Sequence, residues 1–317
     1  MKKKILQRTM IPFILAMVLS VFSACGTVDA PSGESTVTFT DALGREVTVK
    51  KEPERVAALI GSFADVWLLS GGRVCATAED AWNDFGLELP EAVNIGGAHS
   101  PNLELLLSAD PDFVIASAST ASNVAMREVL EAAGICVAYF DIDHFEDYLS
   151  MLDICTNITG RKDLYEQNGL AIQTQIEATK RDFADRGLSD HERTVLLLRA
   201  HSGSVKAKGS EGTILGEMLA DLGCINIADS DTSLLETLSV EGVIRQEPYR
   251  IFVVTMGDDT EKATENLKRM MDENPAWGTL DAVVEGRIHL MDRKLFNIKP
   301  NAKWAESYEK LSELLLG

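Results

Sequence analysis

From residue 25 onwards the sequence has no apolar run near the roughly 20 residues needed to cross a membrane. It also lacks the motifs of common enzymes, because a P-loop GxxxxGK, a GxGxxG after a strand, a GxSxG and an HExxH are all absent. The histidines share no common spacing, and Ser202 beside His201 does not make a catalytic triad. These absences argue against an enzyme, so no catalytic residue is expected.

Basic residues are scarce: 30 Lys and Arg stand against 49 Asp and Glu, a formal net charge of −19. Such a chain repels nucleic acid and anionic lipid, so neither is expected as a partner. Beyond Cys25, no cysteine has the spacing of a metal site, and no intrinsic cofactor or metal is expected. Cys75 and Cys136 lie in apolar, strand-like segments, which favours buried free thiols over disulfides. The other two cysteines are Cys155 and Cys224.

Residues 1–24 have the layout of a bacterial secretion signal: four basic residues, an apolar stretch over 10–22, then small residues before Cys25. A cysteine there resembles a lipobox, in which it is lipid-modified and becomes N-terminal; ordinary secretion is the alternative. Residues 25–37 are small and polar, as in a flexible tether. The chain is therefore expected outside the cytoplasm, held at the cell membrane by a lipid anchor only. Loss of the four basic residues leaves a net charge of −23.

The segment 38–145 alternates strands with helices and is interpreted as an N-terminal α/β lobe. A hairpin over 38–49 turns at Leu43 and Gly44. Alternation of this kind predicts a parallel sheet with helices on both faces. The other strands are expected at 55–60, 73–78, 113–117 and 135–140, with helices at 63–70 and 124–133.

Residues 146–184 show apolar residues at near-helical spacing, which predicts mostly one long helix that Asn157 and Gly160 could dent. A C-terminal α/β lobe is expected over 185–317. The fold class is thus α/β, with two lobes of mainly parallel sheet joined by one long bridging helix and a ligand cleft between them. The strands of the second lobe are predicted at 194–199, 251–256 and 288–292, and its helices at 213–222, 261–272 and 302–316.

An internal repeat supports two lobes on one plan. LELLLSADPDFVI at 103–115 returns in altered form as VEGVIRQEPYRIF at 240–252. Each copy has a polar residue suited to cap a helix, a Glu in the first helical turn (Glu104, Glu241) and a Pro seven residues after the Glu. A strand is predicted after each Pro.

Several longer segments resemble one family. DALGREVTV followed by PERVAAL, and NLELLLSADPDFVIAS, resemble the first lobe of the substrate-binding proteins of ABC importers for iron–siderophores, haem and cobalamin. GSEGTILGEMLADLGCINIAD and KPNAKWAESYEKLSELL resemble its second lobe. The resemblance implies a monomer that delivers an iron chelate, haem or corrinoid to a permease and its ATPase. It also implies that Glu104 and Glu241 dock to permease arginines; the residues alone indicate only favourable helix-dipole charges.

Ligand contacts are expected where parallel strands end. Ser62 is one candidate, although it could simply cap a helix. Trp82, in a polar loop, could stack on a planar ligand or pack on its own loop. Arg199 and His201 suit anion binding or metal ligation, whereas Lys206 and Lys208 are better explained as a solvated hairpin. Trp277 and Trp304 are expected in the core.

Three other functions stay open. A binding protein for bare Zn²⁺ or Mn²⁺ needs three or four converging His and carboxylate ligands, and His99 is the one tempting candidate in the first lobe. A surface-anchored enzyme and a purely structural lipoprotein are the remaining alternatives.

Overall fold

The computed structural model describes residues 35–257 and 259–317. The predicted signal peptide, Cys25 and most of the tether lie outside the described residues. Within those ranges, no helix is both long enough and apolar enough to span a membrane. The first lobe contains β1 (Thr36–Thr40), β2 (Glu46–Lys50), β3 (Val56–Ala58), α1 (Gly61–Leu69), β4 (Val74–Thr77), α2 (Asp80–Asn83), β5 (Val93–Asn94), β6 (Gly96–Gly97), β7 (Ser100–Pro101), α3 (Leu103–Ser108), β8 (Phe113–Ser117), α4 (Ala121–Ala125), α5 (Arg127–Ala132) and β9 (Cys136–Phe140).

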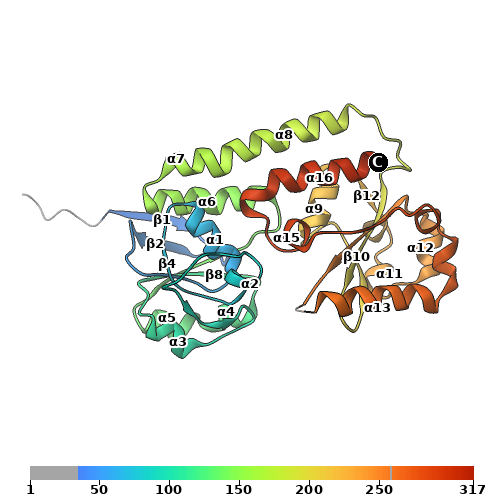
Figure 1. Ribbon diagram of the computed structural model, residues 1–317. Helices are drawn as coiled ribbons and strands as arrows, with labels where there is room; N and C mark the ends of the chain where they lie inside the picture. Colours follow the sequence, from blue (N-terminus) through green and yellow to red (C-terminus); the bar gives the residue numbers. More distant parts are fainter. Residues whose placement is uncertain (1–34, 258) are drawn as a thin grey trace, which may run out of the picture. The chain divides into compact units, whose positions relative to one another are not determined.

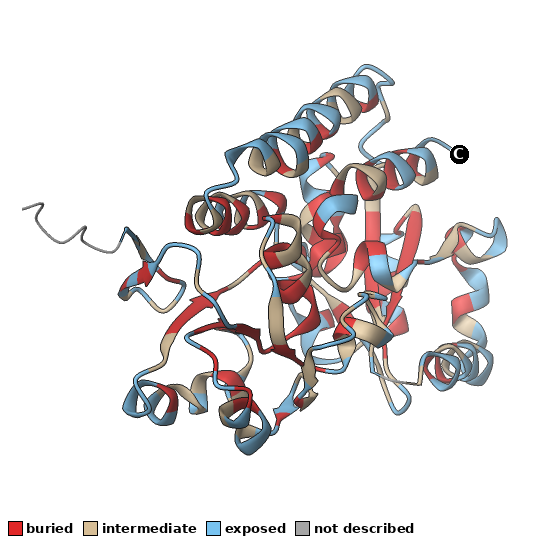
Figure 2. Cartoon of the chain, turned by 60° about the vertical axis from the view of Figure 1, so that its left-hand side comes forward, coloured by how far each residue is buried: buried red, intermediate tan, exposed pale blue. Residues whose placement is uncertain are grey.

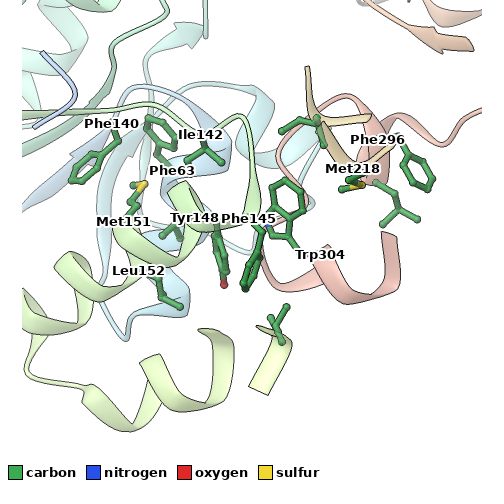
Figure 3. Close-up of a cluster of buried hydrophobic side chains, with 14 of the residues drawn as sticks. Phe63, Phe140, Ile142, Phe145, Tyr148, Met151, Leu152, Met218, Phe296 and Trp304 are labelled. Atoms are coloured by element: carbon green, nitrogen blue, oxygen red, sulfur yellow. The ribbon is translucent and has the colours of Figure 1, made fainter. Parts of the chain in front are cut away.

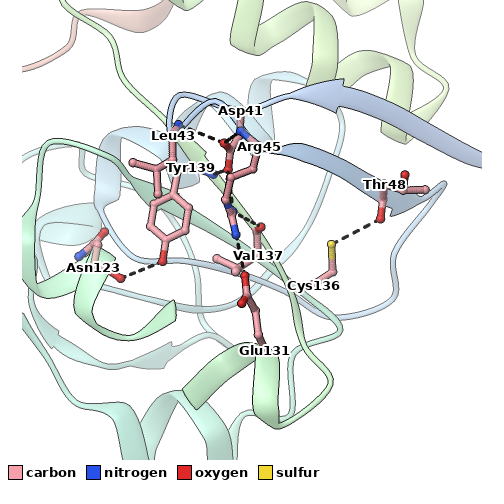
Figure 4. A network of polar contacts seen from close by, with 9 residues as sticks. All are labelled: Asp41, Leu43, Arg45, Thr48, Asn123, Glu131, Cys136, Val137 and Tyr139. Atoms are coloured by element: carbon pink, nitrogen blue, oxygen red, sulfur yellow. Dashed lines mark hydrogen bonds and ion pairs between the residues drawn. The ribbon is translucent and has the colours of Figure 1, made fainter. Parts of the chain in front are cut away.

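The predicted hairpin is present as antiparallel β1 and β2, and the buried carboxylate of Asp41 ties its turn to the sheet (Figure 4). Asp41 accepts the backbone N–H groups of Leu43 and Arg45 at 3.0 Å, and that of Tyr139 on β9 at 3.2 Å. The Arg45 guanidinium donates to it at 2.6 Å. Burial opposes ionisation of Asp41, but the hydrogen bonds from Arg45 and the backbone prevail, so its pKa lies below the usual range.

The first sheet has the strand order β5-β4-β3-β8-β9, and every pair is parallel, as predicted. Its side chains alternate between two cores. Val56 and Ala58 face one cluster, while Ala57 and Leu59 face the other with Leu106 of α3. Figure 1 shows α1 on one side of the sheet and α3, α4 and α5 on the other.

The helical segment after the first sheet is divided, whereas the sequence pattern predicts mostly one helix over 146–184. The helix α6 (Phe145–Thr159) ends at Gly160, whose φ of 73° lies in the left-handed region that favours glycine. The chain then forms a second helical run through α7 (Lys162–Tyr165), the π-helical turn η1 (Glu166–Leu170) and α8 (Ala171–Ala184). The first run packs on α1 and β1, and α8 packs on the C-terminal helix α16. The second helical run, from α7 to α8, is therefore the connection between the two lobes.

The second lobe has the strand order β11-β10-β13-β14, with β12 also paired to β10. All pairs are parallel except β10 with β11, which form the hairpin that the sequence favours for Lys206 and Lys208. The prediction of two α/β lobes with mainly parallel sheets is confirmed. The elements are β10 (Thr194–Ala200), β11 (Val205–Lys208), α9 (Ile214–Asp221), β12 (Ile225–Asn226), α10 (Ile227–Ser230), α11 (Ser233–Glu236), α12 (Val240–Gln246), β13 (Arg250–Thr255), α13 (Thr260–Glu273), η2 (Pro275–Thr279), α14 (Asp281–Val284), β14 (Ile288–Leu290), α15 (Arg293–Phe296), η3 (Asn301–Lys303) and α16 (Trp304–Leu316).

One apolar cluster runs through both lobes (Figure 3). It joins Phe140 and Ile142 at the end of the first sheet to Val254 of the second sheet. Phe145 of α6 meets Trp304 of α16 edge to face, with 6.0 Å between ring centroids. In Figure 2 the strands are largely buried, whereas the helices keep an exposed outer face.

The remaining predictions about side chains hold in part. Trp277 and Trp304 are core residues, as predicted. All four described cysteines are free. Cys155 is buried, but Cys75 and Cys136 are only partly so. Cys136 starts β9, the edge strand of its sheet, and its thiol donates to the Thr48 carbonyl of β2 at 3.6 Å.

The two repeat copies share the same kind of helix cap and the same backbone turn before the Pro. Asn102 and Ser239 cap α3 and α12 through their side chains, as predicted. The residue before each Pro, Asp110 or Glu247, has a positive φ of 48° or 45°. A left-handed residue followed by Pro turns the chain from helix into strand, so both copies make this turn in the same way.

Candidate functional site

At the carboxyl end of the first sheet, the start of α1 lies against α2. A Cβ on Gly61 would stand 2.4 Å from the backbone nitrogen of Ala81, so only glycine fits there. The Gly61 N–H donates to Asp80 of α2 at 2.9 Å. The cap of α1 thus comes from a distant carboxylate. Ser62 is not the N-cap, because α1 begins at Gly61 and the N-cap position is Ile60.

Ser62 is buried, and its exposed fraction of 5% leaves little surface for a ligand. Its backbone carbonyl accepts a hydrogen bond from the Asn301 amide at 2.9 Å, and the same amide reaches Asp65 at 2.8 Å. Asn301 precedes α16, so this contact joins α1 to the second lobe. Burial raises the pKa of Asp65, although the Asn301 hydrogen bond opposes the rise.

Trp82 lies on the short helix α2, not in a loop as predicted, and is partly exposed. Two carboxylates flank it on the same segment. Burial raises the pKa of Asp80, helped by the nearby charge of Asp84, while the bond from Gly61 opposes the rise. The second oxygen of Asp80 is buried without a hydrogen-bond partner among the described residues. This end of the first lobe therefore offers an aromatic ring beside acidic groups.

At the corresponding end of the second lobe, the hairpin of β10 and β11 carries three cations on one face. Arg199 is directly opposite Lys206, and Lys208 is opposite Leu197. Directly opposite residues of an antiparallel pair project from the same face, and like charges placed so destabilise it. Within the described residues, no hydrogen bond or ion pair joins any of these three side chains to a carboxylate, and the Arg199 Nε is buried without a partner.

His201 follows β10 at the tip of this hairpin. The backbone N–H of His201 donates to the Ser204 carbonyl at 2.7 Å, and its backbone carbonyl accepts from the Asn266 side chain of α13 at 3.0 Å. The tip of the hairpin is therefore held in place. Burial lowers the pKa of His201, and the charges of Arg199, Lys208 and Lys206 lower it further. Burial likewise lowers the pKa of Arg199. We name Arg199, His201, Lys206 and Lys208 the basic hairpin; its chemistry suits an anion that replaces the missing carboxylates.

The ends of the two sheets are connected by an ion pair that sequence patterns do not reveal. Arg293, the first residue of α15, donates to both carboxylate oxygens of Asp84 at 2.7 and 3.1 Å. In Figure 1, α2 of the first lobe and α15 of the second are drawn next to each other. The elements with Ser62 and Trp82 thus touch elements of the second lobe, at the carboxyl ends where the sequence predicts ligand contacts.

Glu104 and Glu241 are both exposed in the first turns of α3 and α12, as predicted. The Ser239 hydroxyl lies 3.0 Å from the Glu241 carboxylate. A backbone hydrogen bond at its own amide and then this hydroxyl lower the pKa of Glu241. Each Glu is therefore accessible to a partner.

No group of three or more His, Cys, Asp or Glu in the described ranges is arranged to hold a metal ion. His99 is exposed. Two pockets lie elsewhere on the second lobe: one of about 100 Å³ beside Tyr249 and Arg287, and one of about 340 Å³ beside Leu290 and Leu314. Neither includes a predicted site residue.

Comparison with known proteins defines the class. The chain belongs to the periplasmic binding protein family, whose model matches residues 56–295. The "Uncharacterized ABC transporter substrate-binding lipoprotein YvrC" of Bacillus subtilis is 21% identical over 87% of this chain and 84% of its own length. The "Fe(3+)-citrate-binding protein YfmC" of the same organism is 25% identical over 84% of this chain and 81% of its own. Staphylococcus aureus SirA complexed with staphyloferrin B has the same fold, with a TM-score of 0.65 and 20% identity over 88% of this chain and 96% of SirA.

Proposed function

We propose that this protein is the substrate-binding lipoprotein of an ABC importer and that its ligand is an anionic iron chelate. The observation that carries the proposal is the basic hairpin, where Arg199, Lys206 and Lys208 share one face without a carboxylate partner among the described residues. Like charges held opposite each other cost stability. In a protein with 49 acidic residues, an unneutralised group of this kind is best explained by an anion that binds there.

The chemistry of the hairpin ranks the ligand classes implied by the family resemblance. Ferric citrate and carboxylate or catecholate siderophores present several anionic oxygens, which suit a guanidinium fork and two ammonium groups. Haem presents propionates at one edge, whereas a corrinoid presents mainly amides. Trp82, partly exposed on α2, is available to stack on the chelate. The lowered pKa leaves His201 mainly neutral at pH 7, so it can accept a hydrogen bond or ligate the iron. This function includes no catalytic step.

Replacing Arg199 with Gln tests the proposal. Wild-type protein is titrated with ferric citrate, ferric staphyloferrin B, haem and cyanocobalamin, following tryptophan fluorescence. A charge-assisted hydrogen bond contributes about 1.5–3 kcal/mol, so Arg199→Gln should weaken binding of a ferric chelate on the order of tenfold to a hundredfold. The exposed Arg181 of α8 gives a charge-matched control, and Arg181→Gln should bind as the wild type does. Binding of Zn²⁺ but of no chelate would contradict the proposal.

Delivery to the permease is assigned to Glu104 and Glu241. They occupy matching positions in the two repeat copies and are exposed on separate lobes. Opposite arginines of a permease, they would guide docking through charge complementarity. The loaded protein would bind as a monomer, with one Glu from each lobe engaged.

Membrane attachment is assigned to Cys25, which follows the proposed signal peptide 1–24. A lipid-modified cysteine with two or three acyl chains holds a protein firmly at a membrane, where a single chain does not. Residues 25–37 would tether the lobes outside the cytoplasm. Cys25→Ala should yield unprocessed precursor or released protein in cell fractionation. Processed, membrane-bound Cys25→Ala protein would contradict the anchor.

A further inference from the structure

The ion pair between Asp84 and Arg293 leaves the guanidinium incompletely satisfied. Its two terminal nitrogens hold the two Asp84 oxygens at 2.7 and 3.1 Å. Both side chains are partly buried, with exposed fractions of 24% for Arg293 and 21% for Asp84. The Nε of Arg293 is buried, and no residue in the described ranges accepts its hydrogen. The ion pair is therefore partly exposed to solvent, while the buried Nε of Arg293 has no hydrogen-bond acceptor among the described residues.

The surroundings place this pair among the proposed ligand contacts. Asp84 follows Trp82 by two positions at the end of α2. On the other lobe, Asn297 closes α15 and donates to the Thr255 carbonyl at 2.9 Å. Thr255 pairs with Ala200, the neighbour of Arg199. The pair thus bridges the element that carries Trp82 and the strand ends that carry the basic hairpin.

We propose that Asp84 holds, in the free protein, the guanidinium that an anionic oxygen pair of the ligand takes in the loaded protein. Arg293 is then a ligand-binding residue, and ligand entry exchanges one bidentate partner for another. This inference rests on the proposed function. The geometry supports it because a carboxylate or catecholate presents two oxygens to a guanidinium fork in the way that Asp84 does.

Such an exchange would select among ligands. An anionic chelate gives Arg293 a new bidentate partner, so only Asp84 loses its contact. A neutral ligand cannot compensate and would leave both Arg293 and Asp84 unpaired in a partly buried position, which is costly. Asp84 would therefore act against neutral ligands, as an unfavourable element built into the site. The exchange would also release a contact between the lobes only when an anion is bound.

Two opposite substitutions test the exchange, with the four probes ferric citrate, ferric staphyloferrin B, haem and cyanocobalamin. Asp84→Asn removes the competing carboxylate and should strengthen binding of a ferric chelate about fivefold to tenfold, whereas Arg293→Gln should weaken it about tenfold or more. The double variant should bind as Arg293→Gln does. If Arg293→Gln does not fold, Arg293→Lys keeps the charge without the fork and should bind less tightly than the wild type.

The exposed pair of Arg161 and Asp163 is a matched control, because it is also bidentate, at 2.9 and 2.7 Å. Arg161→Gln and Asp163→Asn should leave affinity unchanged. Equal weakening by Asp84→Asn and Arg293→Gln would make the pair a brace between lobes and overturn the exchange. The exchange would also be overturned if Asp84→Asn strengthened binding equally in a protein that already carries Arg293→Gln, because Asp84 would then act on the ligand by its charge alone. If a chelate binds the wild type and binds Asp84→Asn no more tightly, only the exchange is contradicted. If the wild type binds none of the probes, the proposed function is contradicted and the exchange with it.

Discussion

The two copies of the helix–proline–strand segment, 102–117 and 239–255, share a backbone but differ in the side chains that hold it. In the first copy Asp112 follows the Pro, and its carboxylate accepts the N–H groups of Glu54 and Arg55 at 2.8 and 3.0 Å. In the second copy Tyr249 has that place. The guanidinium carbons of Arg250 and Arg287 lie 4.7 and 4.0 Å from its ring centroid.

This difference indicates that the left-handed residue before each Pro determines the turn, whereas the side chains that hold the turn in place can differ. Asp110 and Glu247 keep their positive φ although hydrogen bonds to a carboxylate have been replaced by contacts with an aromatic ring. The ends of the sheets have diverged further. Acidic groups flank Trp82 in the first lobe, and cations face each other on the hairpin of the second. A shared plan for the backbone therefore carries opposite charges at the two proposed halves of the site.

The largest expected effect concerns the function that both copies would share. Losing one partner of a desolvated charge pair costs about 2–5 kcal/mol, so Glu104→Ala and Glu241→Ala should each weaken permease association. The double variant should lose almost all uptake of labelled ferric chelate while ligand affinity and Tm stay close to the wild type. Glu128 and Glu261 also lie exposed in first helical turns, one on each lobe, and their Ala variants serve as controls. Normal uptake by the double variant would mean that the repeat reflects common origin alone.

The next effect is confined to the first lobe. Asp41→Ala removes a buried carboxylate that pairs with Arg45 and accepts the backbone N–H groups of Leu43, Arg45 and Tyr139. Arg45 keeps Glu131, but the N–H groups lose their acceptor, so the free energy of unfolding should fall by about 3 kcal/mol in urea denaturation. Because the pKa of Asp41 is lowered, its contribution is present above its unfolded pKa of roughly 3.9 and is lost as pH falls through the folded value. Asp41→Asn should therefore flatten the acid side of the stability profile. An unchanged profile would contradict this role.

The smallest effects compare the two turns directly. Tyr249→Ala removes the ring between two guanidinium groups and should cost about 2 kcal/mol, since each such contact contributes about 0.5–1 kcal/mol beyond apolar packing. Asp112→Ala removes two exposed hydrogen bonds and should cost about 1 kcal/mol. Tyr249→Phe and Asp112→Asn are the conservative controls, and thermal denaturation measures all four. A larger loss for Asp112→Ala would reverse the ranking of the two supports.

Much of the fold follows from local patterns, because the buried strands are short apolar runs and the helix caps of the repeat are polar residues at fixed offsets. In the sequence, the division of the helical segment is marked only by Gly160, and the conformation of that residue depends on packing against neighbouring elements. By residue type Ser62 fits either a ligand contact or a helix cap, whereas the carboxylate that bonds the start of α1 is Asp80, 19 positions away. The pairing of Arg293 with Asp84 spans 209 positions, and the hairpin register that aligns Arg199 with Lys206 depends on the turn. Contacts of this kind arise from tertiary structure and leave no periodic signal.

The cluster that joins Phe145 to Trp304 has a consequence for how the chain unfolds. Because both sheets contribute to that single cluster, neither lobe can melt without exposing the other's apolar side chains to water. The lobes are thus separate in their architecture but form one cooperative unit thermodynamically. A chain cut after α8 would lose the part of this cluster that the second lobe supplies, and heat should produce a single calorimetric transition for the intact chain.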